Sequence, residues 1–371
     1  MPAKQATDVV VIGAGVIGCA VAFELARRGA RVAVIDPRGI ARGATFASAG
    51  VLAPYLEADR KGPLLPLAVK SLAMYDGFVA TVSEVAGLSF PYRRSGTLEV
   101  TADEDGFKRL QGLAADLPAA RGIILDREAA REAEPQLAED VIGALLIEEH
   151  GFVAAADLTA ALARGAAAKG ATFLPPRSAV LIEADGAAVS IATTDGAMSA
   201  AAVVLAAGTW SGQLGASAQP PLPVRPVRGQ LLRLRWHAPP LARVVWGPRC
   251  YLVPWPDGSL LVGATMEEVG FDERTTVAGV RDLLESVCDL APGAWQSTFD
   301  EARVGLRPAA PDLLPIVGPS SRVPGLVYAT AHHRNGVLLA PVTASLVADL
   351  VLEGRADPAL EPLAPSRFGY F

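Results

Sequence analysis

The stretch DVVVIGAGVIG, residues 8–18, decides the fold class of this chain. An apolar run of the kind that forms a buried strand leads directly into Gly13, Gly15 and Gly18, and the helical stretch CAVAFELARRGA follows at 19–30. Glycines at this spacing allow a tight turn, a close approach to a pyrophosphate and close packing of the next helix. The helix N-terminus adds N–H donors and a favourable dipole for phosphate. The segment therefore predicts a dinucleotide-binding βαβ unit.

A second strand and an acidic residue follow this loop in register. RVAVI at 31–35 is apolar and ends at Asp36, after which Pro37 stops the ladder. An acidic side chain about 20 residues beyond the glycines can hydrogen-bond a ribose hydroxyl. Arg38 comes next; it would suit a phosphorylated nicotinamide ribose, but an arginine in a turn is usually solvated. A chance glycine turn does not explain so many elements in register.

Composition narrows the class of protein. The chain has 371 residues, 51% of them hydrophobic, which is enough for two well-buried domains, and its formal net charge is -6. The basic residues are scattered, so we expect no nucleic-acid partner. Cys19, Cys250 and Cys288 form no C-x-x-C pair, which indicates no metal site and a reducing compartment.

The chain also shows no sign of export or of a membrane span. No charged-then-apolar leader precedes the first strand, and the apolar stretch 337–352 is interrupted by Thr343, Ser345 and Asp349. That stretch falls short of the roughly 20 residues that a bilayer span requires. We therefore expect a soluble cytoplasmic protein.

The predicted elements divide the chain into a discontinuous pair of domains. After the first βαβ unit the pattern changes to short strands and charged helices, and a buried strand of the first type, AAVVLAAG, returns only at 201–208. Residues 223–300 alternate as antiparallel strands do. The predicted fold class is α/β with an α+β second domain: a dinucleotide-binding domain at 1–85, 141–222 and 301–371, and an antiparallel-sheet substrate domain at 86–140 and 223–300.

This interruption bears on the choice of cofactor. In a nicotinamide enzyme the strands of the dinucleotide-binding sheet usually follow one another without interruption. Here the third strand of that sheet comes only after an inserted segment. Flavoproteins with a glutathione-reductase-type Rossmann domain show that arrangement. We therefore expect FAD.

Two arginines near the C-terminal end lie in apolar segments: Arg307 in VGLRP at 304–308 and Arg334 in AHHRNGVLLAP at 331–341. Arginine is rarely buried without a charged partner, and a planar guanidinium matches a substrate carboxylate. For Arg307 the alternative is a structural ion pair with an acid such as Asp312. Arg228, in an antiparallel strand, is interpreted as solvated. Neither His332 nor His333 is expected to act as a general base, because a histidine near a flavin is as often a packed neutral ring.

At this point the chain resembles the amino-acid oxidase (DAO) family of flavoproteins, most closely its glycine oxidase branch, which serves bacterial thiamine synthesis. The resemblance rests on six segments in the same order: VVVIGAGVIGCAVAFELARRG, ATFASAGVLAP, VVLAAGTWSG, CYLVP with GSLLVGATME, VGLRPAAPDLLPIVGP and AHHRNGVLLAPVTA. These segments cover nearly the whole chain.

The resemblance implies which residues contact FAD, and it implies noncovalent binding, because Cys288 falls in a helix of the substrate domain. The glycine loop and Asp36 would hold the ADP half, and segments near the C-terminal end would approach the flavin ring. The implied contacts are Gly13, Gly15, Val16, Ile17, Gly18, Asp36, Pro37, Arg38, Ala44, Thr45, Ser48, Ala49, Gly50, Val51, Ala179, Ala207, Gly208, Trp210, Gly305, Arg307, His333, Arg334, Asn335, Gly336, Val337 and Leu338.

The resemblance also implies the substrate contacts. Arg307 would pair with the substrate carboxylate, Tyr251 would donate its hydroxyl to it, Arg334 would lie at the same end of the pocket, and Met266 would line the wall. Val51 departs from the methionine common in glycine oxidases, which bears on pocket size.

The activity implied is oxidation of glycine, sarcosine or small D-amino acids by hydride transfer to flavin N5, with O2 as acceptor and H2O2 as product. Relatives of this family suggest a homo-oligomer, for example a tetramer. Two alternatives stay open: a D-amino acid or proline dehydrogenase that passes electrons to a quinone, and a non-catalytic FAD subunit of a hetero-oligomeric oxidase. A flavoprotein that modifies tRNA would need basic patches that the sequence lacks.

Overall fold

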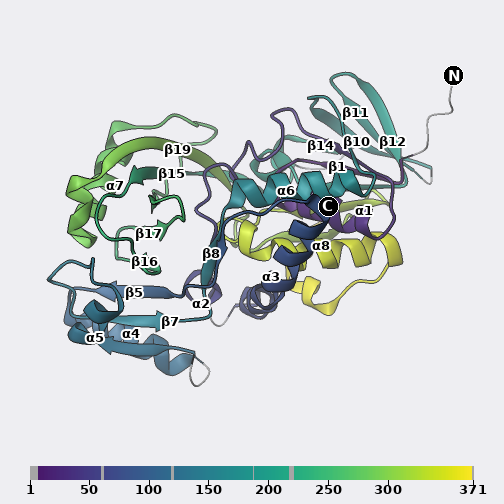
Figure 1. Ribbon diagram of the computed structural model, residues 1–371. Coiled ribbons are helices and arrows are strands. Elements are labelled where there is room, and N and C mark those ends of the chain that lie inside the picture. Colours follow the sequence, from purple (N-terminus) through teal and green to yellow (C-terminus); the bar gives the residue numbers. More distant parts are fainter. Residues whose placement is uncertain (1–6, 60–61, 118–120, 187, 217–220, 370–371) are drawn as a thin grey trace.

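The computed structural model describes residues 7–59, 62–117, 121–186, 188–216 and 221–369. Two large sheets lie at opposite ends of an elongated molecule, and helices pack on each of them (Figure 1). This arrangement confirms the predicted α/β class with an antiparallel second part.

The first sheet is built around the strand that precedes the glycine loop. Its strands follow the order β20-β21-β13-β1-β2-β9, parallel except for β20. β1 (Val9–Ile12) lies between β2 (Val32–Ile35) and β13 (Ala202–Leu205), and all three are buried. The outer strands are β9 (Thr172–Phe173), β21 (Leu326–Thr330) and β20 (Ile316–Pro319).

Alternate side chains of these strands pack against two different layers. Val9 and Val11 contact the core formed with four helices on one face. Val10 and Ile12 point to the opposite core, formed with a smaller sheet. Because both faces are covered, the strands read as continuous apolar runs rather than alternating ones.

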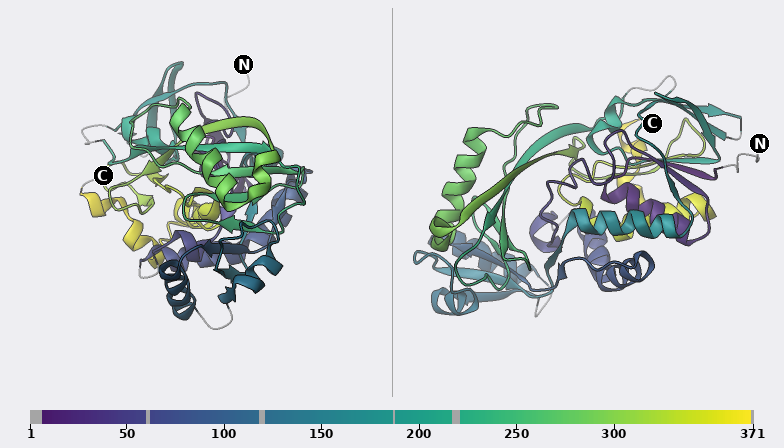
Figure 2. Two further views of the ribbon diagram at one scale, coloured as in Figure 1. Left: turned by 90° about the vertical axis from the view of Figure 1, so that its left-hand side faces the viewer. Right: turned by 45° about the horizontal axis from the view of Figure 1, so that its top comes forward.

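The helical layer contains α1 (Val16–Arg27), α3 (Leu64–Ala86), α6 (Ala155–Ala168) and α8 (Gly336–Glu353). The four helices lie side by side under the sheet (Figure 2). The opposite layer is a four-stranded sheet of β10 (Ala179–Asp185), β11 (Ala188–Thr193), β12 (Gly196–Ala200) and β14 (Gly215–Ala216). A three-stranded sheet of β3 (Val51–Leu52), β4 (Tyr92–Arg93) and β8 (Gly151–Val153) joins the two ends of the molecule.

Two of these helices, α3 and α8, are long and apolar enough to cross a bilayer by composition alone. In α8, 61% of the apolar window is buried inside the protein. Its two faces pack against α1 and α3, which is the environment of a core helix in a compact domain.

The second large sheet has eight strands in the order β19-β15-β18-β17-β16-β5-β7-β6, antiparallel except where β16 meets β5. In chain order they are β5 (Thr97–Thr101), β6 (Ile123–Asp126), β7 (Gly143–Ile147), β15 (Arg225–Arg235), β16 (Val244–Trp246), β17 (Tyr251–Pro254), β18 (Ser259–Gly263) and β19 (Thr298–Ala309). Helices α4 (Glu104–Asp116), α5 (Arg127–Ala133) and α7 (Val277–Leu290) pack on it.

Short helical segments complete the described chain. α2 (Pro54–Glu57) follows β3, and η1 (Gly208–Gln213) follows β13. η2 (Pro292–Gln296) leads into β19, and η3 (Pro358–Leu363) and η4 (Pro365–Phe368) follow α8.

The sheets suggest a division of the chain that differs from the boundaries expected from sequence. A boundary at residue 141 separates β7 from β5 and β6, with which it pairs, and a boundary at 301 cuts through β19. We propose that the substrate domain includes all of β7 and most of β19. β7 is apolar and buried throughout, and β19 is mostly buried from Gly305 onward, so composition did not distinguish these parts from strands of the first sheet.

Candidate active site

A cavity of about 430 Å³ lies between the two parts of the molecule. Its walls come from the glycine loop, the segment 36–51, the end of β13, the strands β17, β18 and β19, and the segment 329–337 that leads into α8. Parallel strands of the first sheet end at this cavity, where ligands of open α/β sheets bind.

The glycine loop is packed on one side and open on the other. Gly13 has φ of +110°, and a Cβ built on it would lie 2.3 Å from the carbonyl oxygen of Ala206. A Cβ on Gly18 would lie 1.9 Å from the carbonyl oxygen of Gly13. Gly15, by contrast, lines the cavity, and a Cβ built on it would contact only the hydroxyl of Thr45, at 3.4 Å. The loop thus presents backbone to the cavity, as a pyrophosphate site requires.

Asp36 stands at the end of β2 and lines the same end of the cavity. Its Oδ2 accepts a hydrogen bond from the backbone N–H of Ala14 (2.8 Å), and its Oδ1 accepts from the N–H groups of Arg38 (2.7 Å) and Gly39 (2.9 Å). These bonds fix the carboxylate beside the loop. Oδ1 already accepts two hydrogen bonds, whereas Oδ2 accepts one and has a second lone pair that can accept a ribose hydroxyl.

Arg38 is not a freely solvated turn residue. Its guanidinium lies 4.7 Å from the ring centroid of Trp210 and forms an ion pair with Glu273 at 3.0 Å. Trp210 also contacts Phe271, with ring centroids 6.2 Å apart. The segment after β18 therefore reaches across the cavity to the dinucleotide end.

The N-terminus of α8 faces the middle of the cavity through Gly336 and Val337. Asn335 precedes the helix without capping it, and its buried Oδ1 has no hydrogen-bond partner among the described residues. The Nε2 of His333 is likewise buried and unpartnered. A helix N-terminus with unsatisfied polar atoms beside it fits the polar edge of a flavin ring.

The two histidines before α8 are neutral at ordinary pH. Burial lowers the pKa of His332 to about 3 and that of His333 to about 4. His332 Nε2 lies 3.1 Å from the hydroxyl of Thr343, inside the protein. These properties favour the expectation that neither is a catalytic base.

Arg307, on β19, lines the substrate end of the cavity. Its Nη1 donates to the backbone carbonyl oxygens of Thr265 (3.0 Å) and Arg228 (3.4 Å). Burial lowers its pKa, as expected for a guanidinium with no anionic hydrogen-bond partner in the described chain. The alternative of a pair with Asp312 is wrong, because Asp312 pairs with Arg367 at 2.7 Å.

The other arginines that line the cavity are all paired with carboxylates. Arg38 pairs with Glu273, Arg249 pairs with Asp289, and Arg334 pairs with Glu57. Among the described cavity residues, Arg307 is thus the guanidinium left open to an anion.

Tyr251 begins β17 and lines the same end of the cavity. Its ring packs against Trp246, with centroids 5.1 Å apart, and it occupies the space beside Gly263, where a Cβ would lie 2.4 Å from the hydroxyl oxygen. Burial raises the pKa of Tyr251, so the phenol stays protonated. Its O–H is a donor that forms no hydrogen bond to another described residue.

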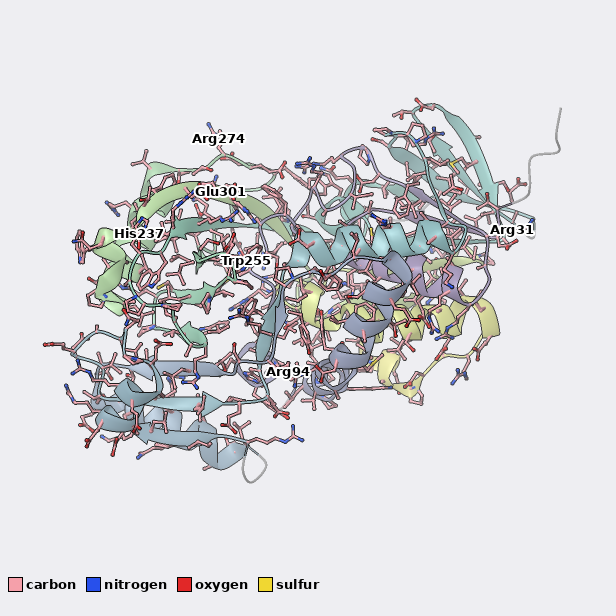
Figure 3. The ribbon with its side chains drawn as sticks, viewed as in Figure 1. Arg31, Arg94, His237, Trp255, Arg274 and Glu301 are labelled. Carbon is pink, nitrogen blue, oxygen red and sulfur yellow. The ribbon has the colours of Figure 1, made fainter. Side chains whose placement is uncertain are left out.

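The expectation that Arg228 is solvated is wrong. Arg228 is 3% exposed and pairs with Glu267 at 2.5 Å and Asp272 at 3.0 Å. Although burial alone would raise it, hydrogen bonds from Arg228, Gln230 and Thr265 lower the pKa of Glu267 to about 2. This network holds the segment after β18 in place. The backbone carbonyl of Thr265 in that segment accepts a hydrogen bond from the guanidinium of Arg307. In Figure 3, Arg274 of that segment lies at the outer edge of the molecule.

Most residues expected at the site line the cavity. These are Gly13, Gly15, Val16, Ile17, Asp36, Pro37, Arg38, Ala44, Thr45, Ser48, Ala49, Gly50, Val51, Ala207, Gly208, Trp210, Tyr251, Met266, Gly305, Arg307, His333, Arg334, Gly336 and Val337.

Four expected residues lie outside the lining. Gly18 is covered by Gly13, and Ala179 belongs to β10 in the small sheet. Asn335 is buried before α8, and Leu338 is 2% exposed in the helical core. Gly18, Asn335 and Leu338 are thus covered by neighbouring residues, whereas Ala179 is partly exposed outside the cavity.

Sequence reasoning missed several lining residues. Glu57 is the main one: it ends the four-residue helix α2, too short to show a periodic pattern. Others are Trp246 and the loop after it, Gly229, Gly263 and Thr265. For Gly229 and Gly263 the signal in the sequence is a glycine within an apolar strand, which marks the close approach of another group.

Comparison with known proteins gives one consistent result. Residues 8–350 match the DAO family, described as FAD dependent oxidoreductases. The chain is 36% identical over 367 residues to a glycine oxidase of Geobacillus kaustophilus, covering 97% of both chains. The crystal structure of glycine oxidase from that organism aligns with a TM-score of 0.93 and 35% identity, over 98% of this chain and 99% of the other.

A second relative has a different length. The chain is 38% identical over 367 residues to the bifunctional protein ThiO/ThiG of Nostoc sp., covering 97% of this chain. It spans only 55% of that protein, about half of its length.

Proposed function

This chain belongs to the DAO family of FAD-dependent oxidoreductases, and from that premise we propose that it oxidises glycine or a similar small amino acid, such as sarcosine or a small D-amino acid, with O2 as acceptor and H2O2 as product. The chain is an FAD-dependent amino-acid oxidase. The particular substrate and the acceptor are the proposed parts.

The residues present fit FAD. Gly15 of the glycine loop presents its backbone to the cavity without a side chain, Asp36 is fixed for a ribose hydroxyl, and the start of α8 faces the cavity. FAD, when bound there, supplies the hydride acceptor for oxidation at carbon. We propose noncovalent binding, because Cys288 lies in α7 outside the cavity lining, and because burial raises the thiol pKa both of Cys19 and of Cys250, the cysteine that lines the cavity.

The single observation that carries the substrate class is the open guanidinium of Arg307. A planar guanidinium in a dry site binds a carboxylate with two parallel hydrogen bonds, which are roughly twice as strong as neutral ones. The Tyr251 hydroxyl is a second donor at this end that has no acceptor among the described residues. Together they would hold an α-carboxylate and orient the α-carbon toward the flavin ring, within a reacting distance of about 3 to 3.5 Å.

No protein base is required in this proposal. The nearest histidines, His332 and His333, have pKa values of about 3 and 4 because they are buried, so they are poor acceptors for a substrate ammonium proton. The substrate is oxidised in its free-amine form. The protein therefore binds the substrate, orients it toward the flavin and excludes water from the site.

The electron acceptor, the pathway and the cellular location are proposed mainly from the similarity to known proteins. Likeness to glycine oxidase supports O2 as acceptor, against a quinone-linked dehydrogenase, and the open Arg307 argues against a non-catalytic FAD subunit. Likeness to ThiO/ThiG supports a role in thiamine synthesis. We also propose a cytoplasmic homo-oligomer without a membrane span.

The test is reduction of the purified yellow holoenzyme without oxygen by glycine, sarcosine, D-alanine and D-proline in turn. Bleaching by at least one of them, followed by stoichiometric peroxide when air is readmitted, is the expected result. Bleaching without peroxide would favour the dehydrogenase. A flavin reduced by none of them would contradict the proposed substrate class.

A further inference from the structure

An ion pair inside the cavity is not needed for binding a single carboxylate. The Nε of Arg334 lies 2.9 Å from Oε2 of Glu57, and its Nη2 donates to Oε1 at 3.1 Å. The Glu57 side chain is 10% exposed. Both residues line the same cavity as Arg307.

Glu57 is held in place by contacts away from the cavity. Two residues before it, the Tyr55 ring stacks on His150 with centroids 5.5 Å apart, and its hydroxyl accepts from Arg121 at 2.5 Å. Arg121 is itself fixed by Glu149 at 2.8 Å. Nearby, Arg94, which Figure 3 labels between the two parts of the molecule, donates to the carbonyl oxygen of Glu149 at 2.6 Å. These contacts fix the beginning of α2, which presents Glu57 to the cavity.

In this position the Glu57 carboxylate is largely removed from water, which disfavours its charged form. Burial raises its pKa, against the lowering effect of Arg334 and, further off, of Arg307. Its Oε2 lies 2.9 Å from the Arg334 Nε, but the two groups are not aligned as a hydrogen bond, and Oε2 accepts none from the other described residues. A buried carboxylate that is incompletely satisfied costs stability, so its presence at the site suggests a role in binding.

The charges of the three groups indicate that role. Arg307 and Arg334 together carry two positive charges at the substrate end, and Glu57 removes one of them. With the carboxylate present, one guanidinium is open to an anion; without it, two would be open. A substrate with a second anionic group at this end would have to displace Glu57 or lie against it, and like charges brought together in a buried site are strongly unfavourable.

We propose that Glu57 determines substrate charge: by occupying Arg334 it restricts the site to amino acids with one anionic group and rejects those with a second. The inference deepens the proposed function and rests on it, because it takes Arg307 as the carboxylate anchor. The substrates admitted are small amino acids with an uncharged side chain or N-substituent.

Binding of non-reacting carboxylates to the holoenzyme tests this without turnover. The probes are acetate, with one carboxylate, and malonate and succinate, with two at different spacings. Each is titrated while the change in the visible flavin spectrum is followed, for the wild type, Glu57→Gln and Glu57→Gln/Arg334→Gln. Glu24→Gln is the control, because Glu24 is comparably buried, at 13% exposed, and paired with arginines on α1 away from the cavity.

The wild type is expected to bind acetate in preference to both dicarboxylates. In Glu57→Gln, the affinity for malonate or succinate relative to acetate should rise at least about tenfold, equivalent to about 1.4 kcal/mol. The double variant should lose that gain, and Glu24→Gln should match the wild type. An unchanged ratio in Glu57→Gln, or a gain that persists without Arg334, would overturn the proposal.

A second variant keeps the test decisive if Glu57→Gln does not fold. In Arg334→Gln the uncovered carboxylate of Glu57 faces the anchor, so acetate should bind about tenfold more weakly; unchanged acetate binding would overturn the proposal. A wild type that binds no acetate and is reduced by no amino acid would reject the proposed function itself. Acetate binding with an unaltered charge preference would reject only the role of Glu57.

Discussion

Gly229 on β15 provides the space that the guanidinium of Arg307 on β19 occupies. A Cβ built on Gly229 would lie 2.4 Å from both Nη1 and Nη2 of Arg307. The two strands pair directly, with Val227 opposite Arg307 and Gly229 opposite Gly305. The anchor for the substrate carboxylate is thus positioned by the absence of a side chain on the neighbouring strand.

Gly229→Ala should displace this guanidinium while leaving the fold intact, because the far end of a flexible side chain can move. We expect KM for the amino acid to rise about 10- to 100-fold, the cost of losing a hydrogen bond to a charged group. Steady-state kinetics and thermal melting measure the two effects. Gly112→Ala, at a helical glycine with nothing within 4 Å, is the control. An unchanged KM in Gly229→Ala would contradict the account of this site.

Tyr251→Phe removes the second donor at the carboxylate. Because the hydroxyl forms no hydrogen bond to another described residue, its loss should leave stability nearly unchanged and raise KM about tenfold. The effect on kcat should be smaller than that on KM. Tyr92→Phe, which loses a surface hydrogen bond to Asp76, should leave KM as it is. Equal kinetics for Tyr251→Phe and the wild type would show that the hydroxyl does not reach the substrate.

Gly13→Ala should abolish FAD retention. The new Cβ would lie 2.3 Å from the Ala206 carbonyl oxygen, on backbone with φ of +110°, so the loop must move. Gly29→Ala is a matched control, since φ there is +93° but nothing lies within 4 Å; it should cost about 1 kcal/mol of stability and keep the cofactor. The ratio of flavin to protein absorbance after purification measures retention. A yellow Gly13→Ala protein would refute the role of the loop.

Buried neutral histidines predict acid sensitivity. Burial lowers the pKa of His150 and of His332 from 6.5 to about 3. Because the unfolded chain binds these protons first, each residue contributes stability that is present above pH 6.5 and is lost as pH falls toward 3, by about 1.4 kcal/mol per pH unit. Chemical denaturation between pH 7 and 4.5 measures the slope. His150→Asn should make the slope shallower, and an equal slope in that variant would contradict the assignment.

The sequence predicted those parts of the site that depend on local spacing. The glycine loop, the strand before it and Asp36 follow from residues close together in the chain. Arg307 and Arg334 were found because a charged side chain in an apolar segment needs a partner. None of these inferences requires knowledge of which strands become neighbours.

The parts that sequence reasoning missed depend on tertiary neighbours. Glu57 reaches the site from a four-residue helix, and the space for Arg307 comes from Gly229, 78 positions earlier in the chain. Arg228 was taken as solvated because it lies in an alternating strand, yet the segment after β18 folds over it and supplies two carboxylates. Such contacts appear only once the strand order is known.

The central claim is that Arg307 holds the carboxylate of a small amino acid for oxidation. The most direct measurement is the rate of anaerobic flavin reduction by sarcosine and by dimethylamine, which lacks the carboxylate, in the wild type and in Arg307→Gln. Sarcosine should reduce the wild type at least about 100-fold faster than dimethylamine, and this advantage should disappear in the variant. If sarcosine reduced both proteins at the same rate, or if dimethylamine reacted with the wild type as fast as sarcosine, the claim would be contradicted.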